Sequence, residues 1–192
     1  IASNLFFYNV LGPIILGAKD NTIISNRCVT NSYEGIAIAD WFDIPARNNI
    51  VKGNTVTSGN GFGFHGFCVN NRIESNMFYA SASYGIGFEN QGGNRNKITG
   101  NVIYNFALGI MMVDGAQTNL ISKNIITNCG IAVFISTNCR FNMAASNIIY
   151  KNYTGLYLVS AHDNSIIDNR NLSYNSNGIA VVFSSNTLVE RN

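Results

Sequence analysis

A six-residue block bounded by two asparagines recurs along this chain and constrains its fold more than any other feature. The block has the pattern Asn-x-apolar-x-x-Asn, and successive copies begin 22 to 28 residues apart. Because such a period marks a repeat architecture, each copy is expected to belong to one structural unit. The copies begin at Asn21, Asn49, Asn71, Asn96, Asn119, Asn142 and Asn164, and an eighth is expected to begin at Asn186.

A second block, Gly-apolar-x-apolar, follows most of the first blocks, for example at residues 35–38, 85–88 and 178–181. The alternation of its apolar residues indicates β-strands. The chain also has 31 asparagines and 18 glycines among its 192 residues, which favours frequent turns. Each repeat is therefore predicted to hold about three short strands separated by turns.

A single set of short strands cannot bury its apolar residues alone, so neighbouring repeats must stack on one another. The predicted fold is all-β: a single-stranded, right-handed parallel β-helix, or solenoid, of about eight coils with 22 to 28 residues per coil. Adjacent coils should lie ~4.8 Å apart. We expect one domain over residues 1–192, in which residues 1–20 form an irregular first coil.

Stacking predicts that equivalent residues of successive coils form columns. The residue two places after the first asparagine should face the core, and the second asparagine should form an internal ladder at a turn. The expected core column is Ile23, Val51, Ile73, Ile98, Ile121, Ala144, Ile166 and Leu188. The expected ladder is Asn26, Asn54, Asn76, Asn101, Asn124, Asn147 and Asn169. These asparagines are interpreted as structural.

Together, the Asn-x-Ile-x-x-Asn and Gly-Ile-x-Val patterns resemble the repeats of the pectate-lyase-like parallel β-helix superfamily. The nearest type is that of NosD-type periplasmic proteins and of carbohydrate-binding and sugar-hydrolase repeats. The resemblance implies a protein that binds or processes a polysaccharide as a lyase, hydrolase or epimerase, located outside the cell, on its surface or on a virion. Since the superfamily also includes adhesins and tailspikes, the alternative is a non-catalytic tail-fibre, surface-layer or filament module.

The outward face of the Gly-containing strands is the expected binding groove. Its floor is predicted two residues after each glycine, where small side chains would leave room for a polymer. The expected floor is Ala37, His65, Gly87, Met111, Ala132, Tyr157 and Ala180.

Acidic residues follow the same strands and are the candidate catalytic groups. Asp40, Glu89 and Asp114 lie four or five residues after their glycines, with His65 on the coil between Asp40 and Glu89. Neighbouring coils would place Glu89 and Asp114 ~5 Å apart, within the range of a glycosidase carboxylate pair. The alternatives are solvated turn residues or a calcium site made from the same carboxylates.

Two longer repeats place further candidates beside these residues, because insertions in solenoids often line the binding face. Trp41 is the only tryptophan and is a candidate platform for a sugar ring, or alternatively a hydrophobic lid. Arg47 and Arg95 are candidates for binding the carboxylate of an acidic sugar, or alternatively solvated turn cations.

Composition limits the other partners. A net charge of +2 with 11% charged residues argues against a nucleic-acid surface. No segment is long and apolar enough to span a membrane, and the four cysteines lack metal-site spacing. No metal or cofactor is therefore predicted, calcium excepted. Since neither end shows a cap, we expect a fragment of a longer protein or an end-to-end or lateral homo-oligomer.

Overall fold

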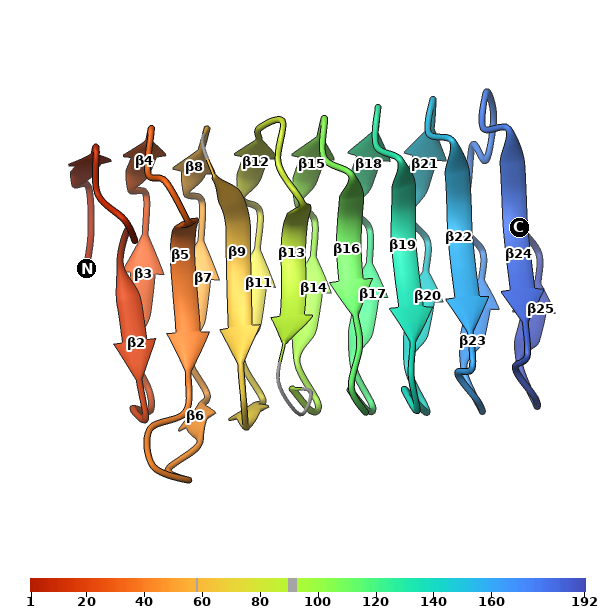
Figure 1. Cartoon of the computed structure of the whole chain (residues 1–192), viewed down its shortest axis with the longest axis horizontal. Helices are drawn as coiled ribbons and strands as arrows, with labels where there is room; N and C mark the ends of the chain where they lie inside the picture. Colours follow the sequence, from red (N-terminus) through yellow and green to blue (C-terminus); the bar gives the residue numbers. More distant parts are fainter. Residues whose placement is uncertain (58, 90–92) are drawn as a thin grey trace.

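The computed structural model describes residues 1–57, 59–89 and 93–192, and within them every regular element is a β-strand. The strands stack coil upon coil into an elongated rod, with the first and last coils at opposite ends (Figure 1). All of the strand pairs between coils are parallel. The predicted parallel β-helix of about eight coils is therefore confirmed. No helix in the described residues is long and apolar enough to cross a membrane.

Three long sheets run the length of the rod, and each coil contributes one strand to each sheet along most of it. In the described residues, sheet A consists of β3 (Thr22–Ile24), β7 (Ile50–Lys52), β11 (Arg72–Glu74), β14 (Lys97–Thr99), β17 (Leu120–Ser122), β20 (Met143–Ala145), β23 (Ser165–Ile167) and β25 (Leu188–Glu190). Sheet B consists of β1 (Leu5–Phe7), β4 (Arg27–Val29), β8 (Thr55–Val56), β12 (Met77–Tyr79), β15 (Val102–Tyr104), β18 (Ile125–Thr127) and β21 (Ile148–Tyr150).

Sheet C has the longest strands and lies at the front of Figure 1. It consists of β2 (Ile14–Leu16), β5 (Glu34–Ala39), β9 (Asn60–His65), β13 (Tyr84–Glu89), β16 (Leu108–Met112), β19 (Ile131–Ser136), β22 (Thr154–Val159) and β24 (Asn177–Val182). A short two-stranded sheet, β6 (Ala46–Arg47) with β10 (Cys68–Val69), lies at the turn between sheets C and A.

The core column stacks as the repeat predicts. Ile73 pairs with Ile98, and Ile98 pairs with Ile121, all in sheet A and all fully buried. The strands of sheet C contribute the widest side chains, and the Phe64 and Phe88 rings stack with their centroids 4.4 Å apart. Apolar burial between the sheets therefore holds every coil to its neighbours.

The asparagine ladder is confirmed, and Asn101 shows how it works. Its Oδ1 accepts hydrogen bonds from both the backbone N–H and the Nδ2 of Asn76, at 2.9 and 3.0 Å. Its own Nδ2 donates to the carbonyl of Ile73 and to Oδ1 of Asn124. Both polar groups of the buried side chain are thus satisfied by neighbouring coils, which burial requires.

Two details of the turns go beyond what the sequence predicts. The first asparagines of the blocks from Asn21 to Asn164 form a second ladder, in which Asn71, for example, donates from its backbone N–H and its Nδ2 to Asn96 Oδ1. The left-handed backbone falls on the residue before the second asparagine, for example Gly53 (φ 63°) and Gly100 (φ 68°). The asparagines are therefore selected for their hydrogen bonds rather than for positive φ.

The two ends of the chain also differ from the expected pattern. In the last coil Val189, and not Leu188, pairs with Ile166, so the predicted core column is wrong by one residue there. The reason is that Asn186 occupies a left-handed turn position (φ 53°), which leaves Thr187 in the place of the first asparagine.

Residues 1–20, expected to be irregular, form most of a coil in register with the next one. β1 pairs with β4, β2 pairs with β5, and the backbone N–H of Asn4 donates to Asn26 Oδ1 at 3.0 Å. Asn4 therefore extends the second-asparagine ladder into this coil, although no complete block marks it in the sequence.

Candidate active site

The outer face of sheet C has three columns of outward side chains, and strand register identifies them. The middle column differs from the prediction, because Gly63, and not His65, pairs with Ala37 and Gly87. Ala132 is also misplaced, since it is fully buried. The observed column is Ala37, Gly63, Gly87, Met111, Phe134, Tyr157 and Ala180.

The misplacement has a local cause. The repeat Gly61-Phe-Gly-Phe offers two glycines two residues apart, and register makes Gly61 the equivalent of Gly35. His65 consequently moves two positions along the strand, to the column where it pairs with Ala39 on one side and Glu89 on the other. The floor is small in its first three members and again at Ala180, and the larger side chains of Met111, Phe134 and Tyr157 lie between them.

Glu34 lies on this outer face and is fully buried. The next residue, Gly35, faces the core, where there is no room for a side chain: a Cβ there would be 2.1 Å from Cγ1 of Val56. The Glu34 carboxylate extends over the next coil, where a Cβ on Gly63 would be 2.1 Å from its Oε1. Two glycines thus create the space in which a carboxylate is buried outside the core.

Two side chains hold the Glu34 carboxylate. His65 Nε2 lies 2.9 Å from each carboxylate oxygen, and the Tyr84 hydroxyl donates to Oε1 at 2.6 Å. Burial, together with the adjacent Glu34 charge, raises the pKa of Tyr84 well above its ordinary value. The phenol therefore stays protonated as a hydrogen-bond donor to the carboxylate.

His65 lies between two carboxylates. Its Nδ1 is 3.5 Å from Oε2 of Glu89, on the side opposite Glu34. The hydrogen bond to Glu34 raises the pKa of His65, the charges of Glu34, Glu89 and Asp40 raise it further, and burial opposes them. The His65 and Glu89 side chains remain 21% and 28% exposed, so this pair can meet a solute while Glu34 cannot.

Asp40 lies beside this pair. Its Oδ2 accepts a hydrogen bond from the backbone N–H of Phe67 at 3.2 Å, and its charge contributes to the raised pKa of His65. Gly66 permits this approach, because a Cβ there would be 2.4 Å from the Asp40 carboxylate. The structure therefore brings three of the four predicted catalytic residues together.

Asp114 lies apart from them. It is exposed in the turn after β16 with φ 53°, two residues beyond Met112, whereas Glu89 directly follows Phe88, the partner of Met112. Its charge raises the pKa of Cys139, on the following coil, after the larger effect of burial. Asp114 adds no contact to His65 among the described residues.

The predicted substrate-binding residues are dispersed. Trp41 is 51% exposed, and its ring meets that of Phe42 edge-on at 4.9 Å in the insertion that protrudes before β6 (Figure 1). Arg47 is exposed at the end of β6 and bridges to Lys19 through the backbone. Arg95 belongs to a turn that lines a groove on sheet A, outside the His65 site.

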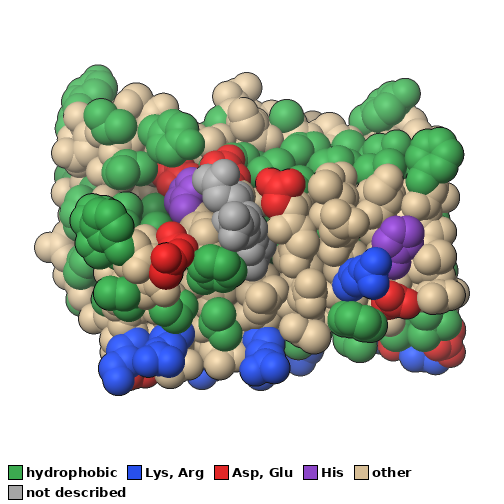
Figure 2. Space-filling view, turned by 60° about the horizontal axis from the view of Figure 1, so that its bottom comes forward, with side chains coloured by type: hydrophobic (Ala, Val, Ile, Leu, Met, Phe, Trp, Pro, Cys, Tyr) green, Lys and Arg blue, Asp and Glu red, His purple; other side chains and the backbone are tan. Residues whose placement is uncertain are grey.

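Glu34 and Tyr84 are the two residues that the sequence analysis missed. Each immediately precedes the glycine of its repeat, Gly35 or Gly85, at the start of a long strand. The sequence signal that could have identified these two residues is a polar or aromatic side chain directly before the glycine of the repeat. Figure 2 shows the result at the surface, where a histidine lies among acidic side chains.

Comparison with known proteins identifies one family. The family model described as "Periplasmic copper-binding protein (NosD)" matches residues 1–138, a stretch that includes Glu34, His65, Tyr84 and Glu89. No curated protein and no solved structure matches the chain.

Proposed function

Because this chain belongs to the NosD family, we propose that it is an extracytoplasmic β-helix protein that binds and cleaves a polysaccharide on the outer face of sheet C. The parallel β-helix and the family match support the general class. The family description, which is that of periplasmic proteins, points to a location outside the cytoplasm. The substrate and the reaction are our proposal.

One observation carries the proposal: a fully buried carboxylate outside the core orients an accessible histidine. Burying Glu34 costs free energy that a purely structural strand would avoid. The cost is offset by hydrogen bonds from His65 and Tyr84. Such an arrangement sets the direction and the protonation state of an imidazole, as catalytic histidines require.

The geometry supports hydrolysis of a glycosidic bond. Protonated His65 would donate the Nδ1 proton to the leaving glycosidic oxygen while Glu34 holds Nε2. The attacking water would form the new bond to the anomeric carbon and release its proton to solvent, because Glu89 Oε2 lies 3.5 Å from His65 Nδ1, on the same side of the sugar as the acid. The negative charges of Glu89 and Asp40 would stabilise the oxocarbenium-like transition state.

Copper, which the family description names, does not fit the described residues. Copper prefers thiolate, thioether and imidazole ligands. The described residues contain no group of three or more His, Cys, Asp and Glu side chains able to hold a metal ion. Burial also raises the pKa of Cys28 and Cys68 to about 12, which disfavours the thiolate form. We derive no step through copper.

A non-catalytic module is the second candidate, and the later coils favour it. There the outer face of sheet C carries Leu108, Met111, Phe134 and Tyr157, and the last two rings lie 5.8 Å apart. A flat apolar surface of this kind suits packing against another molecule.

A polysaccharide screen tests the proposal. Acidic and neutral polymers are incubated with the protein, and both new reducing ends and absorbance from unsaturated products are measured. We expect new reducing ends without unsaturated products, and at least about a hundredfold loss of turnover in His65→Gln and Glu89→Gln.

The matched control is His162→Gln, because His162 is the other histidine of the chain and its side chain bonds to Ser185 at the surface. Its turnover should equal that of the wild type. Unchanged turnover in His65→Gln, or absorbance from unsaturated products, would contradict the hydrolytic mechanism. Binding without turnover in the wild type would favour the non-catalytic module.

A further inference from the structure

A groove on the outer face of sheet A lies over β11, β14 and β17, on some of the coils that carry the His65 site. Its volume is about 570 Å³. Strand register places Arg72 beside Lys97 in one outward column and Glu74 beside Thr99 in the next. The residues of the groove that bear on its chemistry are Arg72, Glu74, Arg95, Lys97, Thr99 and Lys123.

The groove has an excess of positive charge. Arg72 Nε donates to Glu74 Oε1 at 2.6 Å, which neutralises one of the four cations. Among the described residues, Arg95, Lys97 and Lys123 form no ion pair. Three exposed cations around one groove would attract a ligand that carries several negative charges.

The uncharged lining favours a sugar polymer over a nucleic acid. The Thr99 and Ser122 hydroxyls lie 3.3 Å apart in the groove, and Asn70 also lines it. These groups can exchange hydrogen bonds with sugar hydroxyls. No aromatic side chain of the described residues lines the groove, whereas single-stranded nucleic acids are usually held by stacking on aromatic rings.

We infer that this groove binds a polysaccharide that carries carboxylates, such as a polyuronate. The pair formed by Arg72 and Glu74 shows how the guanidinium receives a carboxylate at this position. Arg72 and Lys97 are neighbours on adjacent coils, ~4.8 Å apart, and Arg95 and Lys123 line the same groove, so a polymer bound in the groove would meet several cations.

The groove is separate from the His65 site in both place and charge. Three carboxylates, those of Glu34, Asp40 and Glu89, surround the single imidazole of that site and would repel a polyanion. Figure 2 shows Lys and Arg side chains along the lower left edge of the view, with a histidine and several acidic side chains above them. The inference therefore does not depend on cleavage at His65.

The test measures the affinity of the wild-type protein for polygalacturonate, alginate and neutral dextran by isothermal titration calorimetry at low salt. We expect binding to at least one of the acidic polymers, no binding to dextran, and weaker binding as salt rises. The double variant Lys97→Gln/Lys123→Gln, which removes two groove cations that form no ion pair among the described residues, should lose about tenfold or more in affinity.

The matched control is Arg27→Gln/Lys151→Gln, which removes two exposed cations at sheet B and changes the net charge equally. Its affinity should stay within about twofold of the wild type. Circular dichroism and thermal melting show that each variant is folded. His65→Gln should bind the acidic polymer as the wild type does, so loss of cleavage and loss of this binding are distinguishable.

Three results would overturn the inference. The first is that neither acidic polymer binds to the wild type. The second is that both double variants lose affinity equally, which would show only attraction by net charge. The third is tighter binding of single-stranded DNA or of vesicles containing an anionic phospholipid, because the groove would then serve a different class of polyanion.

Discussion

Sheet C presents two chemically different outer surfaces on one continuous set of strands. Over β5, β9 and β13 the outward residues include Glu34, His65 and Glu89, which form one cluster. Over β16, β19 and β22 the same columns continue with Met111, Phe134 and Tyr157 and other mostly apolar residues. The inward column runs without change through both regions: Ile36, Phe62, Ile86, Ile110, Val133 and Leu156.

This contrast shows that the inward and outward positions of the repeat are under different constraints. Inward residues must match the coil above and the coil below, so every coil has the same pattern. Outward residues have only to leave the strands paired, so neighbouring coils can differ freely. The concentration of polar, titratable side chains on three coils of one face is the reason why we propose those coils as the functional region.

The largest effect is expected from breaking the scaffold that both regions share. Asn101→Ala removes the acceptor for the backbone N–H and Nδ2 of Asn76 and the donor to the carbonyl of Ile73. Leaving several buried polar groups unpaired should lower the free energy of unfolding by about 4 kcal/mol. Urea denaturation of the variant and the wild type measures this difference in the free energy of unfolding.

The control for that loss is Asn177→Ala, at an exposed outward position of β24. Its free energy of unfolding should stay within about 0.5 kcal/mol of the wild type. Equal losses in both variants would show that the buried ladder contributes no more than an exposed asparagine.

A smaller and more local effect should come from filling the space beneath the Glu34 carboxylate. In Gly63→Ala the new Cβ would meet Glu34 Oε1 at 2.1 Å and His65 Nε2 at 2.6 Å, so the cluster must separate. We expect at least about a tenfold loss of turnover while the rod remains folded. Gly178→Ala, which meets nothing within 4 Å, is the control and should behave as the wild type. Full activity in Gly63→Ala would contradict the proposed geometry.

A smaller effect, confined to the polar region of sheet C, is expected in how the protonation of His65 changes stability with pH. Its pKa is raised above 6.5, chiefly by the hydrogen bond to Glu34. A group whose pKa is higher in the folded than in the unfolded protein stabilises the fold when the pH is below its unfolded pKa. This stabilisation is lost as the pH rises through the folded pKa. The stability difference between wild type and His65→Gln should therefore be larger at pH ~5.5 than at pH ~9.

NMR titration of the imidazole checks the cause of that shift. Glu34→Gln should lower the pKa of His65, because the amide carries no charge to hold the imidazolium. Glu74→Gln, which removes a carboxylate on sheet A, should leave it unchanged. An unshifted pKa in Glu34→Gln would show that the buried carboxylate does not control the histidine.

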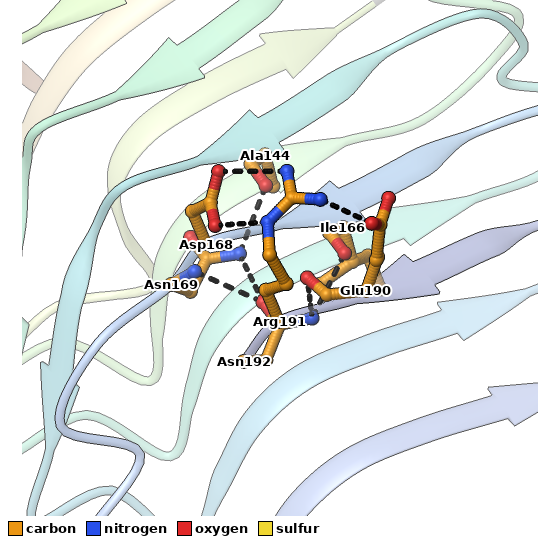
Figure 3. A network of polar contacts seen from close by, with 7 residues as sticks. All are labelled: Ala144, Ile166, Asp168, Asn169, Glu190, Arg191 and Asn192. Atoms are coloured by element: carbon orange, nitrogen blue, oxygen red, sulfur yellow. Dashed lines mark hydrogen bonds and ion pairs between the residues drawn. The ribbon is translucent and has the colours of Figure 1, made fainter.

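The smallest effect is expected at the surface of the coil that contains β25, which carries a polar network (Figure 3). Arg191 pairs with Asp168 at 2.7 Å and also with Glu190, and the hydrogen bond from Arg191 lowers the pKa of Asp168. Arg191→Gln should raise that pKa, as measured by NMR, with almost no change in melting temperature. A large drop in melting temperature would show that the pair matters to stability, unlike most exposed ion pairs.

The sequence analysis predicted the scaffold better than the site. Ile73, Ile98 and Ile121 share a column because burial acts between equivalent positions of successive coils, so the period is visible in the sequence. His65 was assigned to the floor because two glycines in its repeat made the register ambiguous, and strand pairing resolved it. Asp114 was grouped with Glu89 although it lies one residue further along, since a spacing counted from glycine does not account for the end of a strand.

The sequence by itself determined the solenoid, its asparagine ladder and the presence of His65, Glu89 and Asp40 near one edge. Only the tertiary structure joined Glu34 to His65, because that contact crosses 31 residues and needs the inward turn of Gly35 and the missing side chain of Gly63. Periodic constraints repeat in one dimension and can be counted along the chain. Contacts between outward side chains depend on the directions in which those side chains point, and the spacing of residues along the sequence does not show these directions.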